Sequence, residues 1–192
     1  MKKTANSKRG AIIVFVLIIN AIMIFAFTVL LSSVVMDFKM KKLNSKIKKE
    51  FYYAEAGLDE AYAMTLEYLS DVLDYFYENR IENKYGDEYI YNEFKNVIKG
   101  SSNCFYDKDS LAEILTDKDN YLISNEYYPM IDVELKEEQE YFLLKINSYY
   151  KTGEVLNSLS LSCKISVPGN GNELKNITAE NLITDNYWNI GR

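Results

Sequence analysis

Few side chains in this chain could carry out chemistry. The 192 residues include no histidine, so the commonest general base and metal ligand is missing. Adjacent acids such as Asp59 and Glu60, or Glu137 and Glu138, could serve as a general acid and base, but such pairs are more often solvated surface. No C-x-x-C, P-loop or G-x-S-x-G motif occurs. We therefore expect no enzyme, no cofactor and no metal site.

The two cysteines, Cys104 and Cys163, are the remaining reactive pair. If this part of the chain lies outside the cytoplasm, a disulfide between them is permitted. The bridge would close a long loop and contribute up to about 4 kcal/mol through the entropy of the unfolded chain. The sequence leaves this pairing open against two free, buried thiols in a reducing environment.

A basic leader and a long apolar segment precede these residues. Lysines and one arginine, with no acid, stand before Gly10, and no charged residue occurs from Ala11 to Val35. About 20 apolar residues suffice to cross a bilayer as a helix. A cleaved secretory signal has an apolar stretch of only about 7–15 residues and a small-residue cleavage site after it. Segment 11–36 is therefore predicted to be a retained membrane helix.

The helical pattern continues beyond the membrane segment. From Leu43 to Phe76, apolar or small residues recur every three or four positions, which is one face of an amphipathic helix. No proline interrupts this pattern, and Gly57 is the only glycine between Gly10 and Gly86. We expect one helix from about Ala11 to Asn79, whose second half forms the spine of the following domain.

Short helices and then strands are predicted after this spine. Segments 87–98 and 110–115 have helical patterns, the second with a capping box formed by Ser110 and Glu113. After Pro129 the pattern changes to period two, which predicts an antiparallel meander of three strands over about 130–167. The fold class is therefore α+β, a long N-terminal helix with a membrane half and an amphipathic half, packed on a small antiparallel β-sheet.

These patterns divide the chain into five segments. The segments are a basic leader peptide (1–10), a transmembrane helix (11–36), its amphipathic extension (37–79), an α+β outer domain (80–167) and a polar C-terminal tail (168–192). The tail is either partly disordered or folded back as an edge segment.

The charges are sorted along the chain. Segment 37–50 holds six lysines against two acids, whereas 51–192 holds 12 basic and 26 acidic residues, a net charge of −14. The lysines are either a solvated or headgroup-facing helix surface or a surface that meets acidic faces of neighbouring subunits. Because the outer domain is acidic, no direct binding to nucleic acid is expected. Both flanks of the membrane helix are basic, so the orientation with the N-terminus inside rests on the short leader and the large domain that follows.

A second motif provides a resemblance to a known family. Residues 51–61 read FYYAEAGLDEA. A leader ending in Arg9-Gly10, an apolar helix and then the motif Ala54, Glu55, Ala56 and Gly57 about 45 residues further on resemble the type IV minor pilins, most of all those of the PilX type. The pattern is similar also to the K-type minor pseudopilins of type II secretion. The resemblance covers residues 8 to about 65 and implies a pilin-like fold.

The resemblance implies roles for individual residues. A prepilin peptidase would cut after Gly10, and Ala11 would become the methylated N-terminus. Most major pilins carry glutamate at the fifth mature position, where this chain has Phe15, so the resemblance is to a subunit near the tip rather than the bulk building block. Asn20 either bonds within its helix or to a neighbour, or fixes the register against an adjacent pilin helix. Glu55 is either a surface or helix-pairing acid or a functional part of the motif.

The function implied is that of a non-enzymatic minor pilin. The protein would sit in the cytoplasmic membrane with its C-terminal domain outside, and would then join the tip of an extracellular type IV pilus and support its assembly. The implied partners are other major and minor pilins through the N-terminal helix, the prepilin peptidase, the pilus assembly platform, and membrane lipid before assembly. Two alternatives stay open: a minor pseudopilin of a type II secretion or DNA-uptake machine, and a signal-anchored surface adhesin or sensor.

Overall fold

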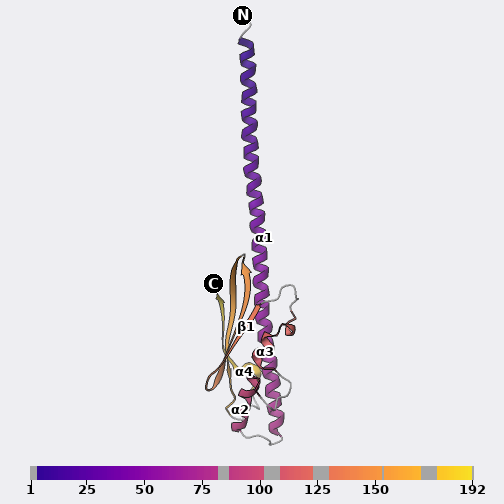
Figure 1. Cartoon of the computed structure of the whole chain (residues 1–192), viewed down its shortest axis with the longest axis vertical. Coiled ribbons are helices and arrows are strands. Elements are labelled where there is room, and N and C mark those ends of the chain that lie inside the picture. Colours follow the sequence, from indigo (N-terminus) through magenta and orange to yellow (C-terminus); the bar gives the residue numbers. More distant parts are fainter. Residues whose placement is uncertain are drawn as a thin grey trace. The chain divides into compact units, whose positions relative to one another are not determined.

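The computed structural model describes residues 4–81, 87–101, 109–122, 130–152, 154–169 and 177–191. The chain divides into two units, Met1–Lys46 and Ile47–Arg192, and each is described by itself. Helix α1, Thr4–Ile81, supplies the described part of the first unit and the beginning of the second (Figure 1). In the first unit every side chain described, from Ile12 onward, is exposed.

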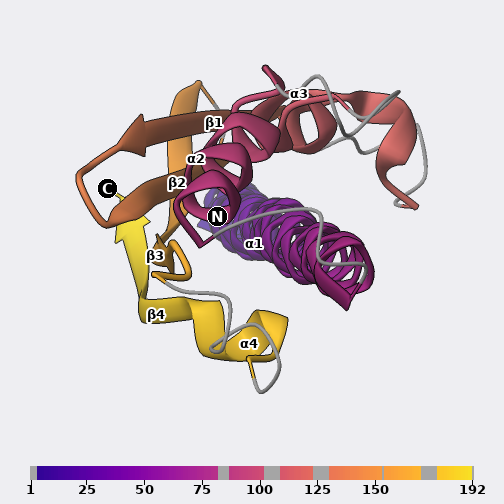
Figure 2. The same ribbon diagram turned by 90° about the horizontal axis from the view of Figure 1, so that it is seen from below.

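The second unit contains a four-stranded sheet. Its strands are β1 (Met130–Glu137), β2 (Tyr141–Thr152), β3 (Val155–Ser166) and β4 (Ile183–Gly191). They are antiparallel neighbours in the order β1-β2-β3-β4. Figure 2 shows this sheet curving around α1, with α3 beyond its β1 side and α4 beyond its β4 side. The protein thus has the α+β fold expected, a long N-terminal helix packed on an antiparallel sheet.

The helix and the sheet meet through one face of each. Along α1, Ala54, Leu58, Ala61 and Leu69 are at most 1% exposed, as the three- and four-residue spacing predicted. Leu43, at the start of the same pattern, belongs to the first unit and is 51% exposed. On the sheet the pleat buries every second residue. The fully buried side chains of β2 are Phe142, Leu144, Ile146 and Ser148.

Two short helices close another side of this core. They are α2 (Asp87–Ile98) and α3 (Leu111–Thr116), followed by the 3-10 helix η1 (Lys118–Asn120). The predicted capping box is confirmed: the Glu113 backbone N–H donates to Ser110 Oγ at 3.2 Å, and the Ser110 N–H donates to the Glu113 carboxylate at 2.8 Å. These bonds satisfy two backbone donors that the helix start would otherwise leave free.

The turn after α2 depends on a glycine. Gly100 has φ +70°, a left-handed conformation that L side chains rarely adopt. A Cβ at Gly100 would also lie 2.8 Å from the Cβ of Ser110. The glycine therefore both ends α2 and allows the cap of α3 to approach it.

The sheet is larger than the three strands expected from the sequence. The described part of the predicted polar tail, 177–191, folds as the one-turn helix α4 (Ala179–Leu182) and strand β4. The tail is thus an edge strand, one of the two alternatives left open for it. In β4 Ile183 is buried, but residues 184–189 are all exposed. The strand therefore shows little apolar alternation, and beyond Ile183 it is held mainly by backbone pairing with β3.

Candidate functional site

The strongest candidate for a functional surface is the uncovered apolar segment of α1 in the first unit, Ile12–Val35. Its large side chains are exposed throughout, Phe15 at 64% and Phe25 at 71%. Water-soluble surfaces rarely expose contiguous apolar patches of this size. At 1.5 Å per residue the segment is about 36 Å long, enough for a hydrocarbon core of about 30 Å. It is a candidate single membrane span.

Two polar side chains of this segment, Thr28 and Asn20, differ in their hydrogen bonding. Thr28 Oγ1 donates to the carbonyl oxygens of Ile24 and Phe25, both at 2.8 Å, so its hydroxyl needs no partner outside the helix. Asn20 is exposed. Within the described residues, no hydrogen bond involves its amide, which leaves the amide available to a second helix.

The other residues singled out in this half of the chain lie on the same helix. Gly10 and Ala11, the predicted cleavage junction, are within α1. Phe15 follows one turn later with its ring exposed.

The structure divides the four-residue motif between the core and the surface. Ala54 and Gly57 are buried on the face of α1 that packs on the sheet, whereas Glu55 and Ala56 are exposed. Residues three apart in a helix share a face, which explains why the two small residues are buried together. Glu55 is exposed, which is compatible with both roles left open for it.

The cysteines were predicted either to pair or to be free. Among the described residues Cys163 forms no disulfide; it is 1% exposed, and burial raises the pKa of its thiol to about 11. A thiol with so high a pKa is almost entirely protonated at neutral pH and is a poor nucleophile. Cys104 lies outside the described residues, so a disulfide between the two remains a prediction.

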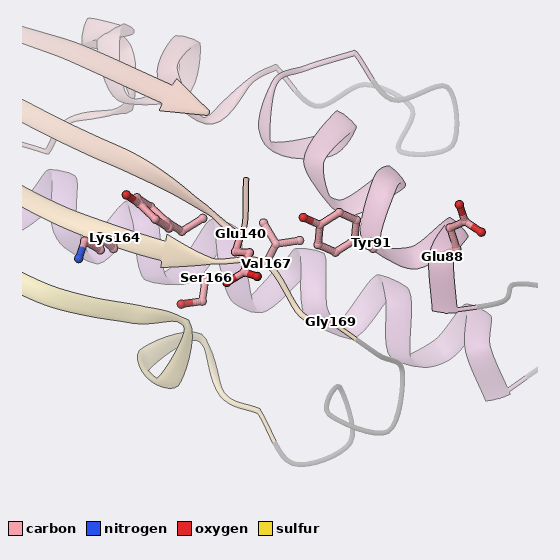
Figure 3. Close-up of a pocket in the computed structure, with 8 residues that line it drawn as sticks. Glu88, Tyr91, Glu140, Lys164, Ser166, Val167 and Gly169 are labelled. Carbon is pink, nitrogen blue, oxygen red and sulfur yellow. The ribbon is translucent and has the colours of Figure 1, made fainter. Parts of the chain in front are cut away.

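A second candidate surface, which the sequence did not indicate, is an open hollow of about 720 Å³ at one end of the sheet. Figure 3 shows Glu88 at one end of it and Lys164 at the other. The residues around it come from α2, from the turn before β2, from the start of β2, from the end of β3 and from the segment after β3. They are Glu88, Tyr91, Glu140, Tyr141, Lys164, Ser166, Val167 and Gly169.

Two polar side chains of this hollow, Lys164 and Tyr91, bind other groups of the protein. Lys164 Nζ lies 2.6 Å from the Asp185 carboxylate, a bond that raises the pKa of Lys164, and 5.4 Å from the centre of the Tyr141 ring. The Tyr91 hydroxyl donates to the backbone oxygen of Gln139, to which Lys95 Nζ also donates, at 2.9 Å. The bonds of Tyr91 and Lys95 join α2 to the turn between β1 and β2, and the contact of Lys164 joins β3 to β4, which is a structural role.

Charge in the second unit is likewise used for packing. The carboxylate of Glu137, at the end of β1, lies 3.2 Å from Nζ of Lys95 on α2 and 2.9 Å from Nζ of Lys99 in the turn after α2. The hydrogen bonds from Lys99 and Lys95 lower the pKa of Glu137. Over the described part of the chain, no group of three or more His, Cys, Asp or Glu side chains is placed to hold a metal ion.

Comparison of the chain with protein-family models, curated proteins and solved structures gave no match. The class of protein is therefore defined by its own fold and surface: an α+β protein with one helix that is a candidate membrane anchor.

Proposed function

We propose that the protein is a non-enzymatic minor pilin, anchored in the cytoplasmic membrane and then incorporated near the tip of a type IV pilus. The observation that supports this proposal is the architecture of helix α1. Its first part exposes an uninterrupted, uncharged apolar surface, and the same helix then buries Ala54, Gly57 and Leu58 under a sheet. An anchor helix that continues as the spine of a folded domain is the architecture that the resemblance to type IV minor pilins implies.

The apolar segment suits two environments in turn. In lipid, a lone helix is stable because its backbone hydrogen bonds are satisfied internally, and the hydroxyl of Thr28 is bonded to its own helix. In a fibre, the same exposed side chains would pack against sister helices in a dry core. Extraction from the membrane would then exchange lipid contacts for protein contacts of similar polarity.

Phe15 supports a position near the tip. The resemblance implies that a subunit in the middle of a fibre uses an acid near its start to neutralise the charged N-terminus of the neighbour on its tip side. Phe15 has no charge, and no acidic residue occurs in the chain before Asp37. A subunit at the tip has no such neighbour to neutralise on one side, so it tolerates the phenylalanine.

The decisive experiment measures the N-terminus of the membrane-extracted protein by mass spectrometry, with and without the prepilin peptidase. A mature chain beginning at a methylated Ala11, seen only when the peptidase is present, supports the proposal. We expect Gly10→Val to block processing and the control Lys3→Gln to leave it unchanged. A chain that keeps residues 1–10 in every case would leave a signal-anchored surface protein.

A second measurement separates pilus from other assemblies. Quantitative immunolabelling of purified fibres should find the protein rare and near the tip. Abundance along the shaft equal to that of the main subunit would contradict the assignment as a minor pilin. Processing without any labelled pilus would favour the pseudopilin alternative.

A further inference from the structure

A band of lysines follows the apolar segment of α1 within the first unit. Lys39, Lys41 and Lys42, which we call the lysine band, are all exposed. At 1.5 Å per residue they lie about 6–10 Å beyond Val35 along the helix. The headgroup region of a bilayer extends about 5–8 Å beyond each side of the hydrocarbon core. If Ile12–Val35 spans the membrane, the ammonium groups reach the level of the lipid phosphates.

Exposed apolar side chains alternate with these lysines. Met36, Phe38 and Met40 are 63%, 68% and 53% exposed. A mixture of apolar side chains and long lysine stems suits the boundary between acyl chains and headgroups, because the stems bury carbon while the ammonium reaches polar groups. A water-exposed acidic protein surface would attract the lysines but would offer nothing for the three apolar side chains.

The neighbouring acid reduces the charge of the band without cancelling it. Asp37 is exposed and stands one turn before Lys41, at a spacing that allows an ion pair within the helix. The segment from Asp37 to Lys42 thus keeps a net charge of +2. Each basic residue near an anionic surface adds to membrane binding, and the attraction fades within a Debye length of about 8 Å.

We infer that the lysine band binds the headgroups of anionic lipids in the leaflet where α1 emerges after Val35. The inference requires that the apolar segment spans the membrane. It does not require the protein to be a pilin, and it does not specify which side of the membrane the band faces. The bound lipids would hold the end of the span at a defined depth. In the proposed pilin they would also retain the subunit in the membrane until a fibre displaces them.

The test uses the full-length protein reconstituted in phosphatidylcholine bilayers that contain a trace of spin-labelled lipid. Electron paramagnetic resonance then compares the association of labelled phosphatidylglycerol with that of labelled phosphatidylcholine. We expect the native protein to prefer phosphatidylglycerol about fivefold at low salt, and less at high salt. The triple variant Lys39→Gln, Lys41→Gln, Lys42→Gln should bring the ratio close to one.

A matched control carries the same change in total charge elsewhere. Lys48, Lys118 and Lys151 are exposed residues of the second unit, and changing all three to glutamine should leave the lipid preference intact. Circular dichroism checks that both variants are folded. Equal loss in the control would mean that overall charge, not the band, attracts the lipid, and would overturn the inference.

Two further results would also overturn it. One is the absence of any preference in the native protein. The other is a protein partner for the band: if copies labelled for energy transfer associate in pure phosphatidylcholine and the band variant abolishes that association, the band binds acidic protein surface instead. Retention of residues 1–10 would refute the pilin proposal while leaving this lipid measurement valid.

Discussion

The ring of Phe51 on α1 meets the ring of Tyr150 on β2 edge to face, with centroids 5.6 Å apart and planes at 86°. Both residues are half-buried, and they join the helix to the sheet near the start of the second unit. Edge-to-face pairs contribute about 0.5–1.5 kcal/mol beyond the area they bury.

A double-mutant cycle should measure this contact. We expect Phe51→Leu and Tyr150→Leu, made singly and together, to give a coupling free energy of about 0.5–1.5 kcal/mol for unfolding. Urea unfolding of the full chain in detergent, followed by the fluorescence of the single tryptophan, Trp188, supplies the numbers. Strictly additive single and double variants would show that the two rings do not interact in solution.

The two alanines of the motif should respond differently to enlargement. Ala54 is 1% exposed against the sheet, whereas Ala56 is exposed. Ala54→Leu should lower the free energy of unfolding by about 1–3 kcal/mol because the added carbons have no space. Ala56→Leu is the control and should change it by less than about 0.5 kcal/mol. Equal effects would mean that the helix faces the sheet with a different side.

Two buried serines should also behave in opposite ways. Ser148 is fully buried, and its hydroxyl has no hydrogen-bond partner among the described residues. Ser148→Ala should therefore be neutral or stabilise the fold by up to about 1 kcal/mol, since an unsatisfied polar group is removed. Ser110→Ala removes the cap of α3 and should cost about 1 kcal/mol. A clear loss of stability in Ser148→Ala would reveal a partner for that hydroxyl.

Two carboxylates with lowered pKa values should make the fold less stable at acidic pH. Hydrogen bonds from Lys99 and Lys95 lower the pKa of Glu137, and bonds from Ser110 lower the pKa of Glu113. A carboxylate with a lower pKa in the folded state stabilises the fold above its unfolded pKa, about 4.3, and that stabilisation is lost as the pH falls through the folded value.

The measurement is the unfolding free energy from pH 7 to pH 3. Glu137→Gln should be less stable than the native protein at pH 7 and should lose less stability on acidification. Because the Glu137 side chain is 37% exposed, the difference should be modest and should shrink in high salt. Parallel pH curves for the two proteins would contradict a lowered pKa at Glu137.

The apolar segment should be sensitive to a single charge. Phe25 is near its middle and 71% exposed. Phe25→Lys should disfavour membrane insertion by about 2.5–3.5 kcal/mol. Carbonate extraction of membranes should then release a larger share of the variant than of the native protein or of the control Phe25→Leu. Unchanged retention of Phe25→Lys would argue against a span centred on this residue.

The sequence by itself determined those features that depend on neighbouring residues. The bounds of α2, the capping box of Ser110 and Glu113, and the first three strands follow from periodicity, capping and turn residues, which are local interactions. The uncharged run from Ala11 to Val35 likewise identified the candidate membrane span without any structure.

Only the tertiary structure decided what depends on contacts distant in sequence. Strand β4 was not recognisable because its exposed side chains lack a period-two pattern, and its place comes from backbone bonds to β3. The spacing along α1 predicted the burial of Ala54, but the burial of Gly57 beside it required knowing which face of α1 the sheet covers. The hollow beside Lys164 and Tyr91 arises where α2 and the strand ends converge, which no local pattern of residues encodes.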